Sequence, residues 1–358
     1  MGETTVTKTL KASVVGLTKS KRDCLDFEYD GFQWWMLFGV DKGILSCYKA
    51  AKGYKQKVAK YKEYPLPIDA RFIREWFRER NNSIADYWIK IPSSKRRGVG
   101  LWLPLKFHQP IPENFEIREA KIIHNGGKYY FHLCVSISAQ KSYFPKTMLG
   151  VDLGLRHPAT VVDFMTRHTY FLGEKLKQVK GKYFYLRRKL GQEKNIKQIK
   201  KMRNKERRKT KTLLHQLSRL IVNLAKELKA ILIIGHLKGI RKDSKGRKFN
   251  RKVGSMPYYS LSHFIEYKAR EVGVPTVFVN EHNTSKTCSV CGGMGSRRGN
   301  WFSCSVCGFG DNADRNAAFN IARRGSSHVL ELGVEASAQK LVKLKEQAST
   351  TQRLLVCN

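Results

Sequence analysis

The sequence predicts a β-rich N-terminal part followed by an α/β part that contains a small cysteine-rich module. Residues 120–138 alternate apolar and polar side chains around an Asn-Gly-Gly turn, which indicates a β-hairpin. The continuous apolar run of residues 230–234 is typical of a buried strand in a parallel sheet. Four of the eight cysteines lie within residues 288–307, and we interpret this cluster as a separate module.

The first 140 residues are expected to form strands interrupted by a helical insert. Within residues 68–88, large aromatic side chains recur among charged ones, and this pattern predicts an amphipathic helix. Residues 48–64 interleave lysine with aromatic side chains, a mixture that suits base stacking and phosphate contact. An ordinary solvated basic helix explains the same stretch equally well.

An α/β pattern begins near Pro145. The predicted elements are two strands joined by a glycine turn (148–162), a long helical region (174–230), a strand (230–234), a basic loop (241–253), a helix (261–272) and a strand (275–279). A helix that returns to a strand is nearly always a right-handed crossover, so we expect strands 230–234 and 275–279 to be parallel. The residues beyond Gly325 contain no motif.

The charge of the chain points to a polyanionic partner. Its 358 residues include 68 Lys and Arg against 29 Asp and Glu, a net charge of +39. Such an excess fits nucleic acid or an anionic membrane surface, and no enzyme of small neutral substrates requires it. Residues 174–212 alone carry 12 Lys, 5 Arg and 3 Glu. The candidate nucleic-acid contacts in this region are Lys182, Arg187, Arg188, Arg203, Arg207 and Arg208.

Membrane insertion and secretion are not expected. The apolar stretches 34–40 and 230–234 are shorter than the roughly 20 residues that a span requires. The first residues also lack the apolar core of a signal peptide. We therefore expect a location in the cytoplasm or nucleoid of a prokaryote, or in the nucleus of a eukaryote. The clustered cysteines then indicate a metal site and not disulfides.

The cysteine cluster has the spacing of a zinc ribbon. Two Cys-x-x-Cys pairs separated by twelve residues match a tetrahedral four-thiolate zinc site, and a glycine directly after each pair permits a tight turn. Four thiolates leave no open position, so we expect a structural zinc ion. Its ligands are Cys288, Cys291, Cys304 and Cys307. The nearby Arg297, Arg298 and Trp301 fit either a nucleic-acid contact or an ordinary surface.

Two aspartates stand out in the α/β part. Asp152 lies in the apolar segment Gly-Val-Asp-Leu-Gly, where a carboxylate is costly to bury unless it binds a cation or is well hydrogen-bonded. Asp314 lies in the first turn of a predicted helix, where the helix dipole favours an acid. Each aspartate taken alone has an ordinary structural explanation. Asp163, at the end of the following strand, is interpreted as a turn carboxylate.

Taken together, these segments resemble the TnpB family of transposon-encoded RNA-guided nucleases, whose relatives include the Fanzor proteins and the type V CRISPR effectors. The resemblance covers residues 149–324 and depends on GVDLG, on the strand followed by Leu-Lys-Gly-Ile (231–240), on TSKTCSVCG (284–292) and on CGFGDNADRNAAFNI (307–321). It implies an RNase H-like RuvC domain with an inserted zinc ribbon, preceded by a wedge-like β-barrel that carries a helical insert. The implied boundaries are 1–30 and 100–145 for the barrel, 31–99 for the helical recognition insert, 146–283 and 310–325 for the RuvC domain, 284–309 for the ribbon that binds target nucleic acid, and 326–358 for the tail.

The resemblance also implies a two-metal site with Mg²⁺ or Mn²⁺ held by three acids. Asp152 and Asp314 match the first and third of them, whereas the family's second acid, a glutamate, is replaced here by Gly235. Glu281 is the candidate replacement, because it ends the strand expected beside 230–234 and adjacent strands lie only about 4.8 Å apart. The resemblance implies the same relocation in Fanzor proteins and some TnpB proteins. His236 is an alternative ligand, and a strand-end acid without a role is the simple explanation of Glu281.

The expected function is RNA-guided DNA cleavage by a metal-dependent endodeoxyribonuclease, with guide RNA and target DNA as partners in a monomeric ribonucleoprotein. Two alternatives remain open at this point. One is a nuclease-dead, RNA-guided repressor, which Gly235 allows. The other is a zinc-ribbon nucleic-acid-binding protein that needs no guide RNA.

Overall fold

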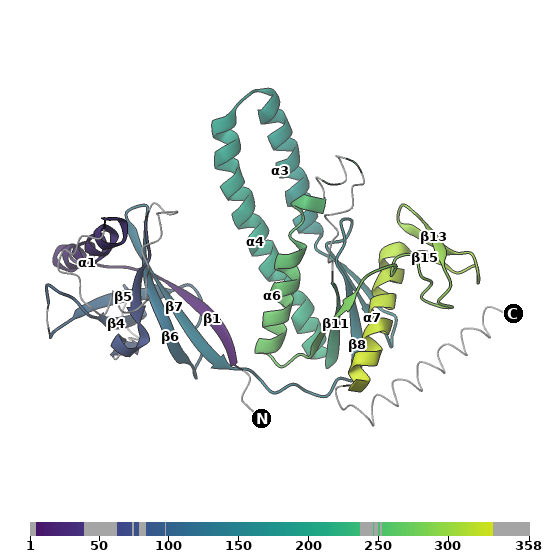
Figure 1. Cartoon of the computed structure of the whole chain (residues 1–358), viewed down its shortest axis with the longest axis horizontal. Helices are drawn as coiled ribbons and strands as arrows, with labels where there is room; N and C mark the ends of the chain where they lie inside the picture. Colours follow the sequence, from purple (N-terminus) through teal and green to yellow (C-terminus); the bar gives the residue numbers. More distant parts are fainter. Residues whose placement is uncertain are drawn as a thin grey trace. The chain divides into compact units, whose positions relative to one another are not determined.

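The computed structural model describes residues 5–38, 63–73, 75–78, 84–96, 98–236, 246, 250 and 253–331. The chain divides into two compact units, Met1–Ala139 and Gln140–Asn358 (Figure 1). This division falls six residues before the predicted start of the nuclease domain at residue 146. The basic aromatic stretch of residues 48–62, most of the predicted loop 241–253 and the end of the tail after residue 331 lie outside the described residues.

The N-terminal unit is built on a seven-stranded sheet with the order β2-β6-β7-β1-β5-β4-β3. The strands are β1 (Thr5–Val14), β2 (Leu66–Asp69), β3 (Trp76–Arg78), β4 (Tyr87–Ile91), β5 (Leu101–Phe107), β6 (Glu116–Asn125) and β7 (Lys128–Ser138). Every neighbouring pair is antiparallel. A closed barrel was predicted for this part. Among the described residues, the strands at the two ends of the sheet, β2 and β3, are not paired with each other.

The predicted hairpin at residues 120–138 is confirmed. Strands β6 and β7 are joined by Gly126 and Gly127, and Asn125 pairs with Lys128 across the turn. Both glycines have positive φ, 59° and 73°, which a two-residue turn with the twist of its flanking strands requires. Side chains of β7 that point inward, such as Phe131 and Leu133, are buried in the core of this unit.

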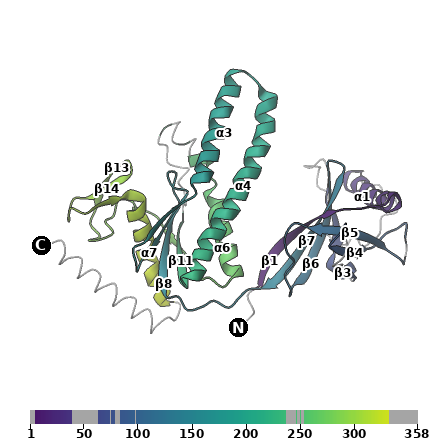
Figure 2. The ribbon, with the colours of Figure 1, turned by 180° about the vertical axis from the view of Figure 1, so that it is seen from behind.

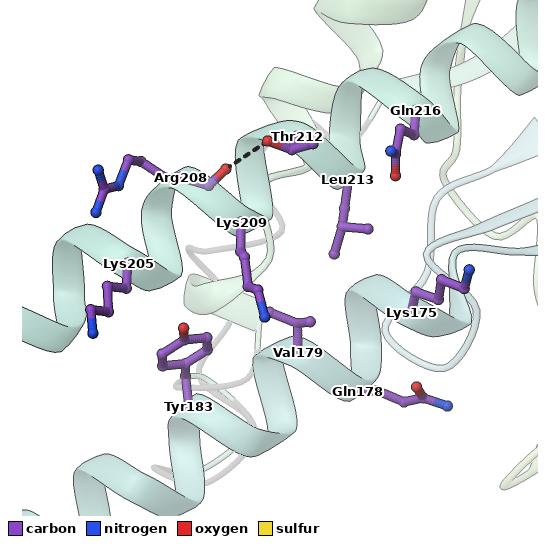
Figure 3. A pocket seen from close by; sticks show the side chains of 10 residues that line it. All are labelled: Lys175, Gln178, Val179, Tyr183, Lys205, Arg208, Lys209, Thr212, Leu213 and Gln216. Carbon is purple, nitrogen blue, oxygen red and sulfur yellow. Dashed lines mark hydrogen bonds between the residues drawn. The ribbon is translucent and has the colours of Figure 1, made fainter.

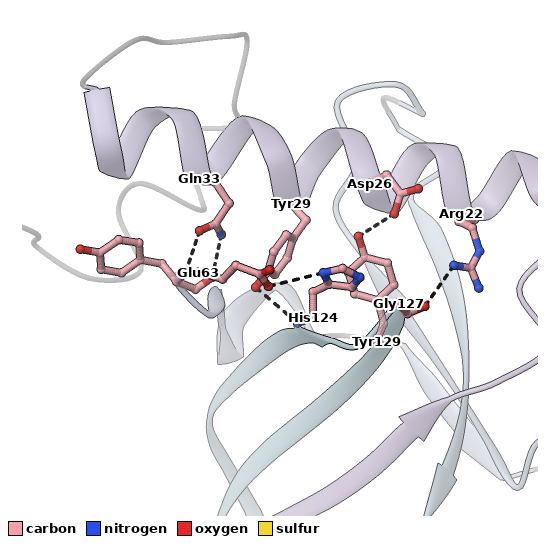
Figure 4. Close-up of polar contacts among 9 residues, drawn as sticks. Arg22, Asp26, Tyr29, Gln33, Glu63, His124, Gly127 and Tyr129 are labelled. Carbon is pink, nitrogen blue, oxygen red and sulfur yellow. Dashed lines mark hydrogen bonds and ion pairs between the residues drawn. The ribbon is translucent and has the colours of Figure 1, made fainter. Parts of the chain in front are cut away.

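A helix, α1 (Lys19–Phe38), covers the N-terminal sheet and lies earlier in the chain than the predicted insert, which was placed at 31–99. Its residues Leu25, Tyr29 and Phe32 recur at helical spacing and are buried against the sheet. Tyr129 at the start of β7 donates a hydrogen bond to Asp26 (2.6 Å), and the Tyr29 hydroxyl accepts one from the backbone of His124, in the contacts that Figure 4 shows.

The amphipathic helix predicted for residues 68–88 was wrong. The segment forms β2, a single 3-10 turn (η1, Ala70–Phe72), β3 and the start of β4. Aromatic residues four positions apart fit one face of a helix, but Trp76 instead stacks on Tyr87 of the neighbouring strand, with ring centroids 5.8 Å apart. Cross-strand aromatic packing and the backbone pairing of β3 with β4 therefore outweigh the helical spacing.

The C-terminal unit contains a five-stranded sheet with the order β10-β9-β8-β11-β12. Its strands are β8 (Thr147–Asp152), β9 (Ala159–Asp163), β10 (Thr169–Leu172), β11 (Ala230–His236) and β12 (Thr276–Asn280). The expected parallel pairing of β11 with β12 is confirmed, and β8 is also parallel to β11. Because parallel neighbours end at the same edge, the carboxyl ends of β8, β11 and β12 lie together.

Helices cover both faces of this sheet (Figures 1 and 2). Leu232 and Ile234 of β11 pack with α4 (Ile196–Glu227) and α6 (Tyr258–Glu271), whereas Ile231 and Ile233 pack with α7 (Ala313–Glu331) on the other face. This two-sided burial explains the continuous apolar run of β11. Helix α7 lies directly on β8, since a Cβ at Gly150 would fall 2.1 Å from a backbone oxygen of α7.

The predicted helical region 174–230 forms two helices that lie side by side, α3 (Glu174–Gln192) and α4. Asn195 begins α4 by accepting a hydrogen bond from the backbone of Gln198 (3.1 Å). Glu206 of α4 is buried and forms ion pairs with Lys180 and Arg187 of α3. Within the part of the chain that the structure describes, no helix is long and apolar enough to cross a bilayer.

Candidate active site and metal centre

Asp152 is the last residue of β8; the residue as a whole is half-buried, and its carboxyl group is shielded from solvent. Burial raises the pKa of Asp152 to about 7, the nearby Asp314 adds to this rise, and Arg297 opposes it. An acid buried beside a second acid is unfavourable in its ionised form unless a cation is also bound there. Positive charge near Asp152 therefore favours its ionised form, and Arg297 supplies part of that charge.

Glu281 directly follows β12 and turns back over the neighbouring strand β11. Gly235 pairs with Val279 in this parallel ladder. A Cβ built on Gly235 would lie 2.0 Å from Oε1 of Glu281 and 2.4 Å from its Cγ. The glutamate side chain thus occupies the space that any side chain at position 235 would need. Burial, and then the charge of Asp152, raise the pKa of Glu281 to about 8.

Asp314 lies in the first turn of α7, as the sequence predicted. The Asn312 side chain accepts hydrogen bonds from the backbone of Asp314 (2.9 Å) and Arg315, so it begins the helix. Asp314 is only 4% exposed, and its Oδ1 accepts a hydrogen bond from Nη2 of Arg297 at 2.9 Å. Its Oδ2 is buried and has no hydrogen-bond partner among the described residues, and the same holds for Oε1 of Glu281.

Asp152 interacts through its charge with both other candidate acids: Asp314 raises the pKa of Asp152, and Asp152 raises the pKa of Glu281. Buried carboxylate oxygens without partners are the ligands that Mg²⁺ and Mn²⁺ prefer. The oxygens of the three acids thus have the chemistry that suits divalent metal ions. Among the described residues, however, the four cysteines are the one group of three or more Cys, His, Asp or Glu residues whose ligand atoms lie close enough together to hold an ion, so the three acids are not drawn together around a single point. His236, the alternative ligand, is exposed at the end of β11, and its ring packs edge-to-face on Phe278.

Arg297 is a further residue of this site, for which the sequence predicted either a nucleic-acid contact or an ordinary surface position. It belongs to β13 (Gly295–Arg298) of the cysteine-rich module, yet its guanidinium pairs with Asp314. No local signal distinguishes it from its neighbour Arg298, because the contact arises only when the β13 hairpin folds back on α7.

The four predicted zinc ligands come together in the structure. Their sulfur atoms all lie within 4.8 Å of one another, and each Cys-x-x-Cys pair is followed by a glycine with positive φ, Gly292 at 77° and Gly308 at 70°. Backbone amides of Val290, Gly293 and Val306 point at the sulfurs. The module adds a three-stranded sheet of β13, β14 (Trp301–Cys304) and β15 (Gly310–Asn312). This geometry fits a tetrahedral zinc ion.

The six basic candidates on the long helices do not share one environment. Arg187 is held in the ion pair with buried Glu206, so its charge ties α3 to α4. The other five are exposed: Lys182, Arg188, Arg203, Arg207 and Arg208. Between the two helices lies an open groove of about 880 Å³ (Figure 3). Among its lining residues are Lys205, Arg208, Lys209 and Tyr183, which combine positive charge with an aromatic ring.

The fold and the site define a mixed α/β protein with an acidic centre next to a four-cysteine module. Residues 258–321 match the family described as Cas12f1-like, TNB domain. The chain is 31% identical over 237 residues to the CRISPR-associated endodeoxyribonuclease Cas12f1 of Sulfoacidibacillus thermotolerans, a match of 58% of this chain and 53% of the relative. It is 27% identical to a TnpB-like protein of Aquifex aeolicus, covering 62% of this chain and 81% of that protein. The chain thus spans about half the length of that Cas12f1.

A solved structure has a similar fold. The protein in a Cas12f1–sgRNA–target DNA complex superimposes with a TM-score of 0.54 over 86% of this chain and 76% of that chain, at 17% identity. The matches in sequence confirm the resemblance to the TnpB family and to proteins named Cas12f1, and the solved structure shows a similar fold.

The raised pKa values predict how the stability of the metal-free protein depends on pH. Asp152 and Glu281 ionise near pH 4 in an unfolded chain, so between about pH 4 and pH 8 the folded state binds more protons and loses stability as pH rises. The drop in melting temperature from about pH 5.5 to 8.5 should be smaller for Asp152→Asn/Glu281→Gln than for the unaltered protein. Equal drops would contradict the raised pKa values.

Loss of one cysteine ligand should release zinc. Cys288→Ser is expected to lower the zinc content from one ion per chain to near zero and to unfold the module locally, because metal binding and folding are coupled. Elemental analysis measures the zinc content, and the part of the tryptophan fluorescence that a Trp301→Phe background removes reports the unfolding of the module. Cys134→Ser, in the N-terminal unit, is the matched control and should keep the zinc. Absence of zinc from the unaltered protein would reject the site.

Proposed function

We propose that this chain is an RNA-guided DNA endonuclease of the TnpB type, whose RuvC site consists of Asp152, Glu281 and Asp314. The observation that carries the proposal is the position of the Glu281 side chain over Gly235. A third carboxylate is thereby supplied from β12 at the place where the sequence has lost the one expected on β11. This position favours an intact nuclease over a nuclease-dead repressor.

The three acids fit a two-metal phosphodiester hydrolysis. Two bound Mg²⁺ or Mn²⁺ ions would activate a water and neutralise the charge on the leaving 3′ oxygen. Asp152 interacts through its charge with both other acids, so it would help to hold the ions together with each of them. Arg297 donates a hydrogen bond to the carboxylate of Asp314, and its positive charge is suited to hold the scissile phosphate next to the metals.

The remaining domains are assigned by the same proposal. Residues 146–283 and 310–325 form the RuvC domain, and 284–309 form the zinc ribbon that binds target nucleic acid. Residues 1–30, 31–99 and 100–145 would contact guide RNA and the DNA duplex, and no role is proposed for 326–358. The active particle is a monomeric ribonucleoprotein, located where the host keeps its DNA.

Two surfaces of the C-terminal unit support contact with nucleic acid. The groove between α3 and α4 carries lysine and arginine side chains around Tyr183. On the zinc ribbon, Trp301 is 57% exposed, and it pairs with Arg298 across the β13–β14 hairpin. An exposed indole beside a guanidinium suits stacking of a base and contact with its phosphate.

A cleavage assay with the protein purified together with its co-expressed RNA tests the proposal directly. The RNA is sequenced, and plasmids carrying a matching target are incubated with the particle and Mg²⁺. Guide-dependent cutting supports the proposal. Guide-dependent binding without cutting would replace it by a repressor, and binding that needs no guide RNA would replace it by a zinc-ribbon nucleic-acid-binding protein.

Exposed arginines on the long helices should behave differently from Arg187, which forms an ion pair with buried Glu206. Arg207→Ala removes an exposed charge, so it should weaken DNA or RNA binding and lower the salt dependence of the affinity by about one phosphate contact, with no change in melting temperature. Arg187→Ala leaves buried Glu206 with one fewer partner, so it should lower the melting temperature. Binding titrations at several salt concentrations and thermal unfolding measure both. Identical profiles for the two variants would contradict the distinction.

A further inference from the structure

One face of helix α7 is fastened to the loop that joins Glu281 to the first zinc knuckle. Asn316 accepts a hydrogen bond from the backbone of Ser289 (2.9 Å) and donates one to the carbonyl of Thr287 (2.7 Å). Asn320, one turn later, donates to the carbonyls of Thr284 (2.8 Å) and Thr287 (2.7 Å). Both asparagines are buried, with exposed fractions of 0% and 4%.

The same loop carries groups of both metal centres. At its start, Thr284 donates two hydrogen bonds to the carbonyl of Glu281, from its backbone amide (3.1 Å) and from its hydroxyl (2.9 Å). At its end, Ser289 lies between the zinc ligands Cys288 and Cys291. The loop is therefore a short rigid connection from a candidate catalytic acid to the zinc knuckle.

Helix α7 presents its other face to the sheet. Residues 316 and 320 are four apart and share the loop-facing side, whereas Asp314 precedes Asn316 by two residues and so lies on the opposite side of the helix. Ala318 and Ile321 pack on the sheet on that opposite side. Any rotation or slide of α7 that breaks the asparagine contacts would also move the Asp314 carboxyl group.

We propose that Asn316 and Asn320 are positioning residues that couple the zinc knuckle to the acidic metal site. They fix the position of the segment that carries Glu281 relative to the helix that carries Asp314, and the zinc ion keeps the loop between them folded. Zinc occupancy then controls the affinity of the acids for divalent metal. This inference rests on the proposed two-metal site.

The test measures Mn²⁺ binding in the absence of nucleic acid, by the loss of the free-ion electron paramagnetic resonance signal. The double variant Asn316→Ala/Asn320→Ala is expected to raise the Mn²⁺ dissociation constant by about 10- to 100-fold, the range found when groups that orient metal ligands are removed. Its zinc content should stay at one ion per chain, because all four cysteines remain. Asn204→Ala, an exposed asparagine of α4, is the matched control and should bind Mn²⁺ like the unaltered protein.

A second arm tests the coupling itself. Cys288→Ser, which removes zinc, should also weaken Mn²⁺ binding, and combining it with Asn316→Ala/Asn320→Ala should weaken binding by less than the product of the separate effects. Unchanged Mn²⁺ affinity in the asparagine variant, or effects that multiply, would overturn the coupling. If the double variant does not fold by circular dichroism, Asn320→Ala and Asn316→Ser are measured singly by the same criteria.

Glu281→Gln separates failure of this inference from failure of the proposed function. If Glu281→Gln weakens Mn²⁺ binding but the asparagine variants do not, the acidic site stands and the coupling is wrong. If Glu281→Gln leaves Mn²⁺ binding unchanged, the acids are not the metal site, and both the coupling and the proposed function are rejected.

Discussion

Glu281→Gln is expected to reduce guide-directed DNA cleavage by about 10³-fold, with DNA binding retained. Glutamine has the shape of glutamate, so the packing over Gly235 should survive. It lacks the negative charge needed to hold a divalent ion beside Asp152, and loss of metal-borne charge stabilisation costs several kcal/mol, about 1.4 kcal/mol for each tenfold in rate. Single-turnover cleavage with Mg²⁺ measures the rate, and gel-shift titration measures binding.

His236→Ala is the control for this result. The imidazole is exposed and packs on Phe278 (ring centroids 5.9 Å apart), so its removal should leave most of the cleavage rate. A Glu281→Gln variant that cuts at the unaltered rate, or a His236→Ala variant that is inactive, would transfer the role of second ligand away from Glu281.

Moving the carboxylate from position 281 to position 235 gives a sharper test of the same assignment. Gly235→Glu alone should be inactive or unstable, because its Cβ would fall 2.4 Å from Cγ of Glu281. Glutamine at 281 would keep this clash, so the matching partner is Glu281→Gly. The combined variant Gly235→Glu/Glu281→Gly should recover more cleavage than Gly235→Glu does, since the carboxylate then reaches the same space from β11.

Asp152→Asn is expected to reduce the cleavage rate by a similar factor, about 10³-fold or more, and to raise the melting temperature of the metal-free protein. Asp152 is coupled to both other acids, so the neutral amide removes like-charge repulsion in a buried site. Asp314→Asn should also abolish cleavage but should not stabilise the protein as much, because Arg297 loses its charged partner. Cleavage assays measure the loss of activity in both variants, and thermal unfolding in the presence of a chelator measures the difference in stability between them.

Asp163→Asn is the matched control in the same sheet. Asp163 accepts hydrogen bonds from the backbone of Met165 and the hydroxyl of Thr166 in the turn after β9, which confirms its interpretation as a turn carboxylate, and one more from Thr147 of β8. Its replacement should lower the melting temperature and leave the Mg²⁺ dependence of cleavage unchanged. Full activity in Asp152→Asn would reject the assignment of the metal site.

Features whose cause is local were predictable from the sequence. The β6–β7 hairpin follows from two adjacent glycines with positive φ, and the cysteine cluster follows from two short knuckles. The parallel pairing of β11 with β12 follows from the handedness of a helical crossover. The helix predicted for residues 68–88 failed because its aromatic spacing suits both a helix and a strand, and only the neighbouring strands decide between them.

The sequence by itself identified the candidate metal ligands, which are the four cysteines, Asp152 and Asp314. Because Gly235 has no side chain, the sequence also indicated that a two-metal site would need a substitute for the second acid. Tertiary structure decided the rest. It laid the Glu281 side chain over Gly235, paired Arg297 with Asp314, and fastened Asn316 to Ser289. The physical reason is that turns and metal knuckles depend on residues near one another in the chain, whereas these contacts depend on segments that only the packing of β11, β12 and α7 brings together.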